Sequence, residues 1–265
     1  MSDEKPTRAI ERTVEIDAPI EAVWKAISEG EELAKWFALD ARVTPGVGGE
    51  VWLSWPGMEG ASPISVWEPG KRLQTREEHG PVLMTVDWQL EAKGGKTLLR
   101  LVHSGFGTDA AWDDQYDDTS RGWAVFLGNL AHYLERHRGA AVRQVMIPVP
   151  IEVPIEEAWT RLMGPRGIAL DTTGLAPSGR YATTAATGDR LEGVVDLLAP
   201  PRVFGGTVAA WNDAMLRMEF QGCGPGKVQC WFVILTYGMP EADVEALRAR
   251  WTALLTPLFG PSSLT

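Results

Sequence analysis

The stretch IDAPIEAVW, at Ile16–Trp24, returns later in the chain as IEVPIEEAW, at Ile151–Trp159. Ile, Pro, Ile, Glu and Trp hold the same places in both copies, at a constant offset of 135 residues (151 minus 16). In each copy the proline suits the first turn of a helix, where its missing N–H costs nothing. Solenoid repeats are shorter, roughly 20–50 residues. The chain is therefore predicted to contain one domain twice.

Two weaker similarities between the halves of the chain support the duplication. Pro69–Leu73 reads PGKRL, and Pro200–Phe204 reads PPRVF, which aligns with it after a one-residue gap. A large apolar residue also recurs with the spacing 4, 3, 4 at Trp123, Leu127, Leu130 and Leu134, and again at Leu247, Trp251, Leu254 and Leu258. The boundary falls near Arg138–Ala141, so we expect a first domain at residues 1–139 and a second at residues 140–265.

The first half predicts a strand, two helices, several strands and a closing helix. A strand at Thr7–Ile16 leads into a helix from Ile20, and a short second helix covers Glu31–Phe37. Strand-like runs follow between Gly and Pro turn signals, at Val51–Trp55, Ile64–Trp67, Arg72–Thr75, Val82–Leu90 and Thr97–His103. The closing helix is expected at Ser120–Arg138, because one apolar stripe runs along it at helical spacing.

The second half repeats this order. It predicts a strand at Val145–Ile151, a helix at Ile155–Leu162 and a closing helix at Glu241–Phe259. The strand-like runs between them are Arg180–Thr184, Leu191–Leu198, Val203–Ala210, Met215–Phe220 and Val228–Tyr237. Each half is expected to form a curved antiparallel sheet with a helix against its concave face. Such an interior is either closed by side chains or keeps a cavity for a ligand.

Composition and charge narrow the possible partners. The chain has 265 residues, of which 45% are hydrophobic and 23% charged, as in globular proteins. Its formal net charge is −10, and a nucleic-acid partner is excluded because a phosphate backbone needs a basic face. No apolar run approaches the roughly 20 residues of a membrane span. The N-terminus lacks the apolar stretch of a signal peptide, so we expect a cytoplasmic protein.

Two cysteines, Cys223 and Cys230, flank the turn-like Gly224–Lys227. They could face each other across a hairpin, but in a reducing cytosol we expect two free thiols rather than a disulfide. Zinc is not expected, because no histidine or second cysteine pair lies nearby.

Six short motifs follow one another in the first half. They are APIEAVW at Ala18–Trp24, WF at Trp36–Phe37, GGEVW at Gly48–Trp52, PGKRL at Pro69–Leu73, LVHSGF at Leu101–Phe106 and GW at Gly122–Trp123. In this order they resemble the activator-of-Hsp90-ATPase-like (AHSA1-like) branch of the START/Bet v 1-like (SRPBCC) helix-grip superfamily, over most of residues 8–138. The second half keeps the entry motif and the closing helix. It has LTYGM at Leu235–Met239 where the first half has VHSGF.

The resemblance implies an α+β fold with two tandem helix-grip domains. In each, a curved antiparallel sheet of about seven strands grips a long C-terminal helix, around a cavity that often takes a hydrophobic or polycyclic aromatic molecule. The second domain, with fewer motifs, is expected to be a degenerate copy. In length and tandem architecture the chain is also similar to double-START proteins encoded in enediyne biosynthesis clusters of the dynemicin type, and some such relatives protect the producer against its own product.

Twelve tryptophans stand against four tyrosines, and most of them lie in the first half. If aromatic side chains there face the concavity, they form a slot for a flat ligand. The candidate ligand-binding residues are Trp36, Phe37, Trp52, Trp55, Trp67, Trp88, His103, Phe106, Trp123 and Phe126. A plain packed core explains them about equally well, and the resemblance favours the slot. Because side chains alternate along a strand, Trp52 and Trp55 are predicted to face opposite sides unless a bulge intervenes.

His103 is the main candidate for polar chemistry. It lies at the end of a predicted strand beside Ser104, and it could shuttle a proton or anchor a ligand; Tyr116 is a further candidate. The sequence shows no partner that would orient the imidazole ring, as nucleophile–base pairs require. A structural histidine that bonds a loop backbone, with Gly105 permitting the turn, is therefore favoured, and no catalytic residue is predicted.

A dense acidic run precedes the predicted closing helix, at Asp109, Asp113, Asp114, Asp117 and Asp118. It lacks the spacing of an EF-hand calcium loop. We expect a solvated loop that places negative charge before the helix N-terminus, where the helix dipole favours it.

We expect no metal site and no cofactor from the remaining polar residues of the chain. His132 and His137 are five residues apart on the closing helix, a poor spacing for metal ligands. The sequence does not decide whether the side chains of Arg72 and Arg100 point into the interior or away from it. An arginine that points inward would need a carboxylate such as Asp87 or an anionic ligand.

Three functions are compatible with these observations. The first is a non-catalytic protein that binds a hydrophobic or polycyclic aromatic small molecule, in natural-product biosynthesis or self-resistance. The second is an aromatase/cyclase-like enzyme in which His103, Ser104 or Tyr116 moves protons. The third is a chaperone-interacting protein, as the family name suggests, although the sequence identifies no protein partner.

Overall fold

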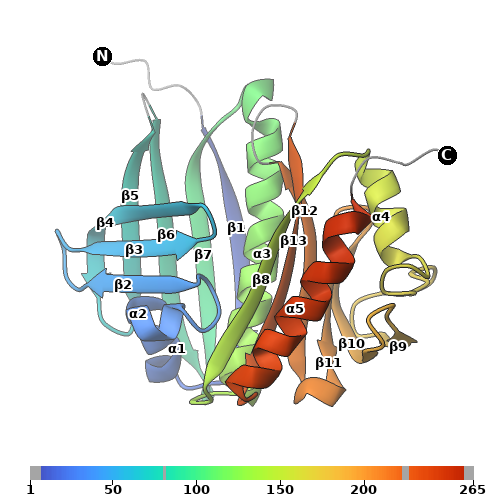
Figure 1. Cartoon of the computed structure of the whole chain (residues 1–265). Helices are drawn as coiled ribbons and strands as arrows, with labels where there is room; N and C mark the ends of the chain where they lie inside the picture. The colour runs from blue at the N-terminus through green and yellow to red at the C-terminus, as the bar shows by residue number, and fades with distance from the viewer. Residues whose placement is uncertain (1–6, 80–81, 223–226, 260–265) are drawn as a thin grey trace. The chain divides into compact units, whose positions relative to one another are not determined.

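The structure is a computed structural model that describes residues 7–79, 82–222 and 227–259. The chain divides into two compact units, Met1–Arg138 and Gly139–Thr265. Each unit is an antiparallel sheet packed against helices, and among the described residues the first sheet has seven strands and the second six (Figure 1). The predicted α+β fold with tandem helix-grip domains is confirmed.

The first unit follows the predicted order of elements. Its elements are β1 (Thr7–Ile16), α1 (Ile20–Ser28), α2 (Gly30–Leu33), β2 (Asp40–Thr44), β3 (Glu50–Trp55), β4 (Met58–Glu68), β5 (Arg72–His79), β6 (Val82–Lys93), β7 (Lys96–Gly107) and α3 (Asp113–Arg136). The strands lie in the order β1-β7-β6-β5-β4-β3-β2, so the last strand returns beside the first. β2 was not predicted, because its alternation of polar and apolar residues extends over only five residues.

The first sheet bends sharply at β4. The pairing of β4 with β5 shifts register between Ile64 and Val66, which marks a β-bulge. Figure 1 shows the consequence: β2 and β3 run across the direction of β5 and β6. The bend gives the sheet a concave face, against which α3 packs through β1 and β7.

The closing helix α3 begins at Asp113, seven residues before the predicted start at Ser120. The acidic run is therefore mostly helical and not a loop, which corrects the expectation from the sequence. Asp113 lies in the first turn and pairs with Arg8, and Asp118 pairs with Arg121. Acidic residues suit a first helical turn because of the helix dipole. The apolar stripe starts later because this end of α3 is largely exposed.

A bulge in β7 brings His103 and Phe106 to the same side of the strand. Arg8 pairs with Phe106 while Ala9 pairs with Ser104, so Gly105 is an extra residue in the strand. Its φ of 108° is in the region that favours glycine. Simple alternation would place His103 and Phe106 on opposite faces, but the extra residue brings their rings to 4.7 Å between centroids.

The outer face of the first sheet carries a polar network. Arg72 donates to both carboxylate oxygens of Asp87, at 2.9 and 2.8 Å, and Gln89 donates to Asp87 at 3.1 Å. Arg100 donates to Gln89 and to Glu11, at 3.2 and 2.7 Å. Both arginines thus face away from the interior, which answers the question that the sequence left open.

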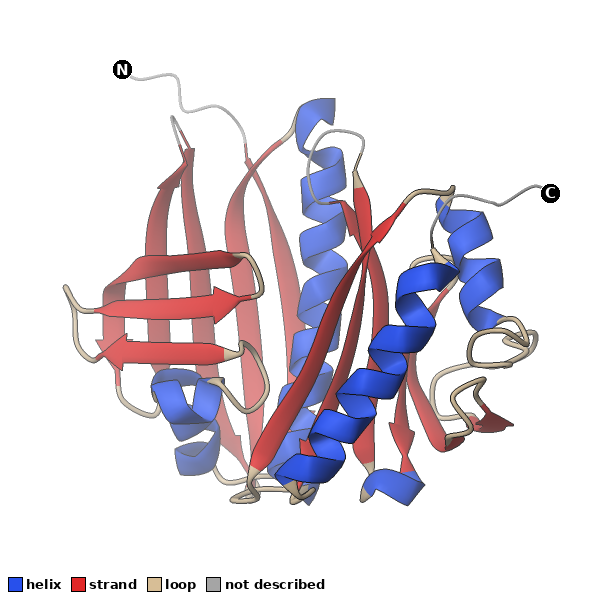
Figure 2. Cartoon of the chain, in the orientation of Figure 1, coloured by secondary structure: helices blue, strands red, loops and turns tan. Residues whose placement is uncertain are grey.

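The second unit has the same order with one strand fewer. Its elements are β8 (Val142–Ile151), α4 (Ile155–Met163), β9 (Arg180–Thr184), β10 (Arg190–Ala199), β11 (Val203–Val208), β12 (Ala214–Gly222), β13 (Val228–Tyr237) and α5 (Glu241–Leu258). Its strand order is β8-β13-β12-β11-β10-β9. Figure 2 shows α5 lying along its sheet. Turns rather than a further strand follow α4, so the described sheet ends at β9.

An apolar cluster fills the interior of the second unit. Trp251 on α5 is fully buried and stacks on Phe232 of β13, with ring centroids 4.6 Å apart. Cys230 is a buried free thiol on the same strand, and burial raises its pKa. Cys223, its predicted neighbour across the hairpin, lies outside the described residues.

In the described parts of the chain, none of the helices combines the length and apolar composition that crossing a membrane requires.

Replacement of Gly105 by alanine is expected to destabilise the first unit. A Cβ there would collide with the carbonyl oxygen of Leu83, and the backbone conformation disfavours any side chain. We expect a loss of about 1–3 kcal/mol, measured by urea unfolding of the intact protein. Gly60→Ala is the matched control, since its Cβ would meet nothing within 4 Å, and it should cost less than about 0.5 kcal/mol. Equal effects would contradict the role of the bulge.

The contribution of Asp87 to stability should be lost in acid. Burial raises the pKa of this carboxyl, but hydrogen bonds from Arg72 and Gln89 outweigh it, so the pKa lies below its ordinary value of 3.8. A carboxyl with a lowered folded-state pKa stabilises the protein above the unfolded value and loses this effect as the pH falls through the folded value. The stability difference between wild type and Asp87→Asn should therefore be constant above about pH 5 and shrink below pH 3.8. A difference independent of pH would contradict this assignment.

Candidate functional site

A cavity of about 160 Å³ opens in the first unit between the concave face of the sheet and α3. Its lining comes from four neighbouring strands and the N-terminal half of α3: Ser62, Thr75, Glu77, Met84, Val86, His103 and Gln115. Thr75 and Met84 are buried and form its floor, whereas Glu77 and Gln115 are exposed and mark its mouth. The site is therefore a small pocket that is open at one end of the helix-grip interior.

Strand register explains why these side chains meet. Thr75 pairs with Val86, and Val86 pairs with His103, so these three form one row across β5, β6 and β7. Glu77 and Met84 form the next row. Side chains two residues apart on a strand share a face, so both rows point into the concavity.

An indole orients His103. The Nε1–H of Trp123, on α3, donates to Nδ1 of His103 at 3.0 Å. An indole can only donate, so Nδ1 must offer its lone pair and the ring proton must lie on Nε2. This hydrogen bond fixes the orientation of the imidazole ring. It supplies the orienting partner that the sequence did not reveal.

Beside the cavity, aromatic side chains pack on one another. Phe37 lies against several rings, with centroid distances of 5.1 Å to Trp36, 5.5 Å to Trp123 and 4.6 Å to Phe126. Trp88 packs edge-on against Trp36 at 6.1 Å and Trp123 at 5.4 Å. These five residues form the aromatic cluster. It occupies the part of the interior where the sequence allowed either a slot or a core.

Three further predicted aromatic residues are not part of this cluster. Trp55 packs against Phe37 at 5.5 Å and donates its indole N–H to the Phe37 carbonyl at 3.1 Å. Trp52 instead lies under the guanidinium of Arg42, at 4.5 Å, so it faces the opposite side from Trp55, as strand alternation predicts. Trp67 packs edge-on against Trp24 of α1 at 5.2 Å.

The three candidates for proton transfer are not brought together. His103 lines the cavity, but the Ser104 hydroxyl lies on the other face of β7, 2.6 Å from the hydroxyl of Thr85. The Tyr116 hydroxyl donates to the backbone carbonyl of Ala9 at 3.2 Å, and Arg8 lies over its ring. The geometry offers no assembled acid–base set around His103 and these two hydroxyls.

The sequence analysis missed most of the cavity lining. Ser62, Thr75, Glu77, Met84, Val86 and Gln115 were not candidates, because no one of these residue types signals a site by itself. Two of them could have been predicted from the register of β5, β6 and β7, because Thr75 and Val86 lie in one row with His103.

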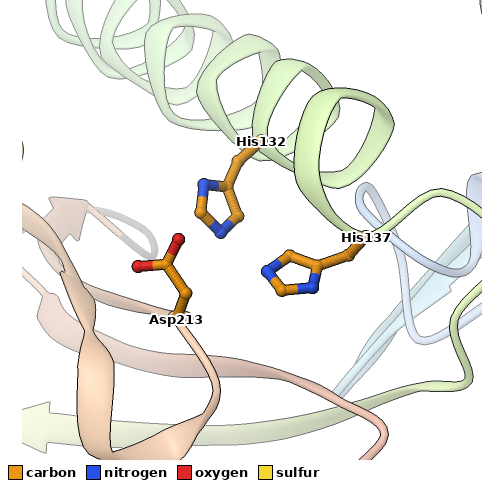
Figure 3. A group of neighbouring side chains, drawn as sticks. All are labelled: His132, His137 and Asp213. Carbon is orange, nitrogen blue, oxygen red and sulfur yellow. The ribbon is translucent and has the colours of Figure 1, made fainter.

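Two histidines lie near the C-terminal end of α3. The ring centroids of His132 and His137 are 5.1 Å apart, although their spacing of five residues separates side chains on a regular helix (Figure 3). His137 follows the last helical residue and has a φ of −131°, so its side chain no longer follows the helical path. Asp213, also drawn in Figure 3, belongs to the second unit.

A model of the family described as Activator of Hsp90 ATPase homolog 1-like protein matches residues 17–135. The first unit is an AHSA1-like domain. The predicted recognition is therefore confirmed for the half of the chain that contains the cavity. The second unit repeats the helix-grip order of elements beyond the matched residues. A search among curated proteins finds no match.

The chain, with its two helix-grip domains, is also similar to solved structures. DynU16, a protein in the dynemicin biosynthetic locus, has 18% identity, and the alignment covers 96% of this chain and 98% of that one, with a TM-score of 0.42. The di-domain ARO/CYC BexL from the BE-7585A biosynthetic pathway has 18% identity over 96% and 99% of the two chains, with a TM-score of 0.44. Aha1 from Colwellia psychrerythraea has 22% identity over 50% of this chain and 99% of its own, with a TM-score of 0.45.

Two tryptophan substitutions should separate core packing from surface stacking. Trp36 is 1% exposed and donates its indole N–H to the Ala26 carbonyl at 3.0 Å. Trp36→Ala should lower the free energy of unfolding by about 3–5 kcal/mol. Trp52→Ala, which removes only the stacking on Arg42, should cost about 1 kcal/mol. Calorimetry of the intact variants measures both, and a tolerated Trp36→Ala would contradict a packed aromatic cluster.

Proposed function

We propose that the AHSA1-like domain binds a small hydrophobic or aromatic molecule in the cavity between its sheet and α3. The observation that carries the proposal is the cavity itself, which has a floor of Thr75 and Met84 and a polar mouth at Glu77 and Gln115. Ligand sites combine an apolar surface with a few placed polar groups, and this lining does so. Burial of apolar ligand surface would supply the affinity, at about 25 cal/mol per Å².

The geometry supports binding rather than catalysis. A general base at His103 would have to take a proton on a nitrogen that has a free lone pair. Nδ1 already accepts the hydrogen bond of Trp123, and Nε2 carries the ring proton. The hydroxyls of Ser104 and Tyr116 are engaged elsewhere. A hydrogen-bonding role for His103 fits this arrangement better than proton transfer.

A place in natural-product metabolism is part of the same proposal. A binding domain without a catalytic set would carry or sequester a metabolite, for delivery to an enzyme or for protection of the producing cell. The chemical class of the bound molecule would separate these roles, and the size of the cavity limits that class.

Methyl NMR of the intact protein tests the binding. With 13C-labelled methionine methyl groups, a titration with phenol should shift the signal of Met84, which lines the cavity, in a saturable way. The signal of Met58, which is 59% exposed on the same domain, should stay unchanged. Val86→Phe would fill the cavity and should abolish the shift.

The proposal fails if neither phenol nor larger aromatic probes move the Met84 signal while the protein is folded. It also fails if Met84 and Met58 shift together, since that would indicate general adsorption. Val86→Leu, which adds a single methylene, provides a matched control for the effect of substitution at this position.

A further inference from the structure

The concave face of the first sheet is uncovered along the start of β4. Glu59, Gly60 and Ala61 are all exposed, although successive residues of a strand point to opposite faces. Both faces of β4 are therefore open to solvent at this point. Further along the strand Ile64 is 2% exposed, so the concave face is covered there. An antiparallel sheet commonly packs one face on the core and leaves only the other to solvent, so the open concave face needs an explanation.

Strand register places Gly60 on this concave face. Gly60 pairs with Leu53 of β3, and Leu53 lies two residues before Trp55, whose ring packs against Phe37 of the aromatic cluster. Ser62, two residues after Gly60, lines the cavity. Both observations put Leu53 and Gly60 on the same side of the sheet as the cavity. We call these two residues the open strip.

The open strip offers space and an apolar surface. A Cβ on Gly60 would meet no atom of the described residues within 4 Å. Leu53 is partly exposed, so its side chain presents apolar surface beside that space. A glycine inside a strand often marks a place where a ligand approaches the backbone closely. Since neither side chain is polar or charged, the surface favours an apolar group.

The open strip is continuous with the cavity through Ser62. The distance from Ser62 to Gly60 along β4 is about 7 Å, the rise of two strand residues. The cavity of about 160 Å³ is close in volume to an engineered protein cavity of roughly 150 Å³ that binds benzene, so it holds about one ring. A substituent that leaves such a ring beside Ser62 therefore reaches the open strip.

From the uncovered face, the space above Gly60 and the continuity with the cavity, we infer that the AHSA1-like domain binds a ring with an apolar tail. The ring occupies the cavity, and the tail lies along Leu53 and Gly60. The inference rests on the proposed function, because it presumes that the cavity binds a ligand. It adds a second subsite and the shape of the molecule that fits both.

Two probes test the second subsite by calorimetric titration of the intact chain. Phenol has the ring alone, and 4-butylphenol adds a tail that reaches the open strip. Full burial of one methylene strengthens binding about fourfold. A tail with one side in solvent gains about half that free energy, or about twofold per carbon, so 4-butylphenol should bind at least about tenfold more tightly than phenol. Equal affinity for the two probes would overturn the inference.

A pair of aspartate variants assigns the gain to one face of β4. Gly60→Asp places a charge on the open strip, and it should reduce the advantage of 4-butylphenol to about twofold or less while phenol binds as before. Ala61→Asp is the matched control, because Ala61 is exposed and pairs with Trp52, which faces the other side. It should keep the full advantage. An equal advantage in both variants would overturn the inference.

Gly60→Leu tests the same space without a charge. The backbone at Gly60 does not have a positive φ, so a side chain is compatible with its conformation. The leucine should occupy the place of the tail and reduce the advantage of 4-butylphenol as Gly60→Asp does. An advantage that survives Gly60→Leu in the folded protein would overturn the inference.

The Met84 methyl signal separates this inference from the proposed function. If neither phenol nor 4-butylphenol shifts it, the proposed function fails, and the inference fails with it. If both probes shift it with equal affinity, the cavity binds and only the second subsite is wrong. A second copy of the chain is the other possible occupant of the open strip. Dimerisation in analytical ultracentrifugation that Gly60→Asp abolishes and Ala61→Asp preserves would overturn the inference.

Discussion

The indole of Trp123 lies between the aromatic cluster and His103, which lines the cavity. On one side it packs against Phe37, Trp88 and Phe126, and on the other it donates its N–H to His103. A large aromatic ring with a single donor can serve both sides, because its faces need apolar neighbours and its nitrogen needs one acceptor. The aromatic cluster and the cavity therefore meet at this residue. Gln115 of the same helix lines the cavity, so α3 contributes to the cavity as well as to the core.

The β7 bulge is the second part of this arrangement. Gly105 allows His103 and Phe106 to face the same interior, so the imidazole lies between a phenyl ring and the indole of Trp123. A strand without the extra residue would present one of these two side chains to the outer face. The motif VHSGF thus has a physical explanation: Gly105 forms the bulge, His103 lines the cavity, and Phe106 is buried against the His103 ring.

The second unit has the same fold but lacks the hydrogen-bonded pair of His103 and Trp123. By the shared 4, 3, 4 spacing, Leu247 stands at the place of Trp123, and LTYGM puts Thr236 at the place of His103. The Thr236 hydroxyl donates to the backbone carbonyl of Arg143 at 2.9 Å. The core of the second unit instead contains Trp251, which lies four residues after Leu247 on the closing helix. Its ring stacks on Phe232. The duplicated fold therefore holds two differently built interiors.

The order of elements, the duplication and the helix-grip fold could be predicted from the sequence alone, because periodicity, turn residues and the repeated IxxPIExxW pattern are local signals. The alternation that separates Trp52 from Trp55 was predictable for the same reason. The start of α3 was not, since its exposed acidic first turns carry no apolar stripe. The cavity lining was decided by tertiary structure: Thr75, Val86 and His103 are far apart in the chain and meet only through strand register. The orientation of the His103 ring likewise depends on an indole from another element, and no pattern within β7 could reveal it.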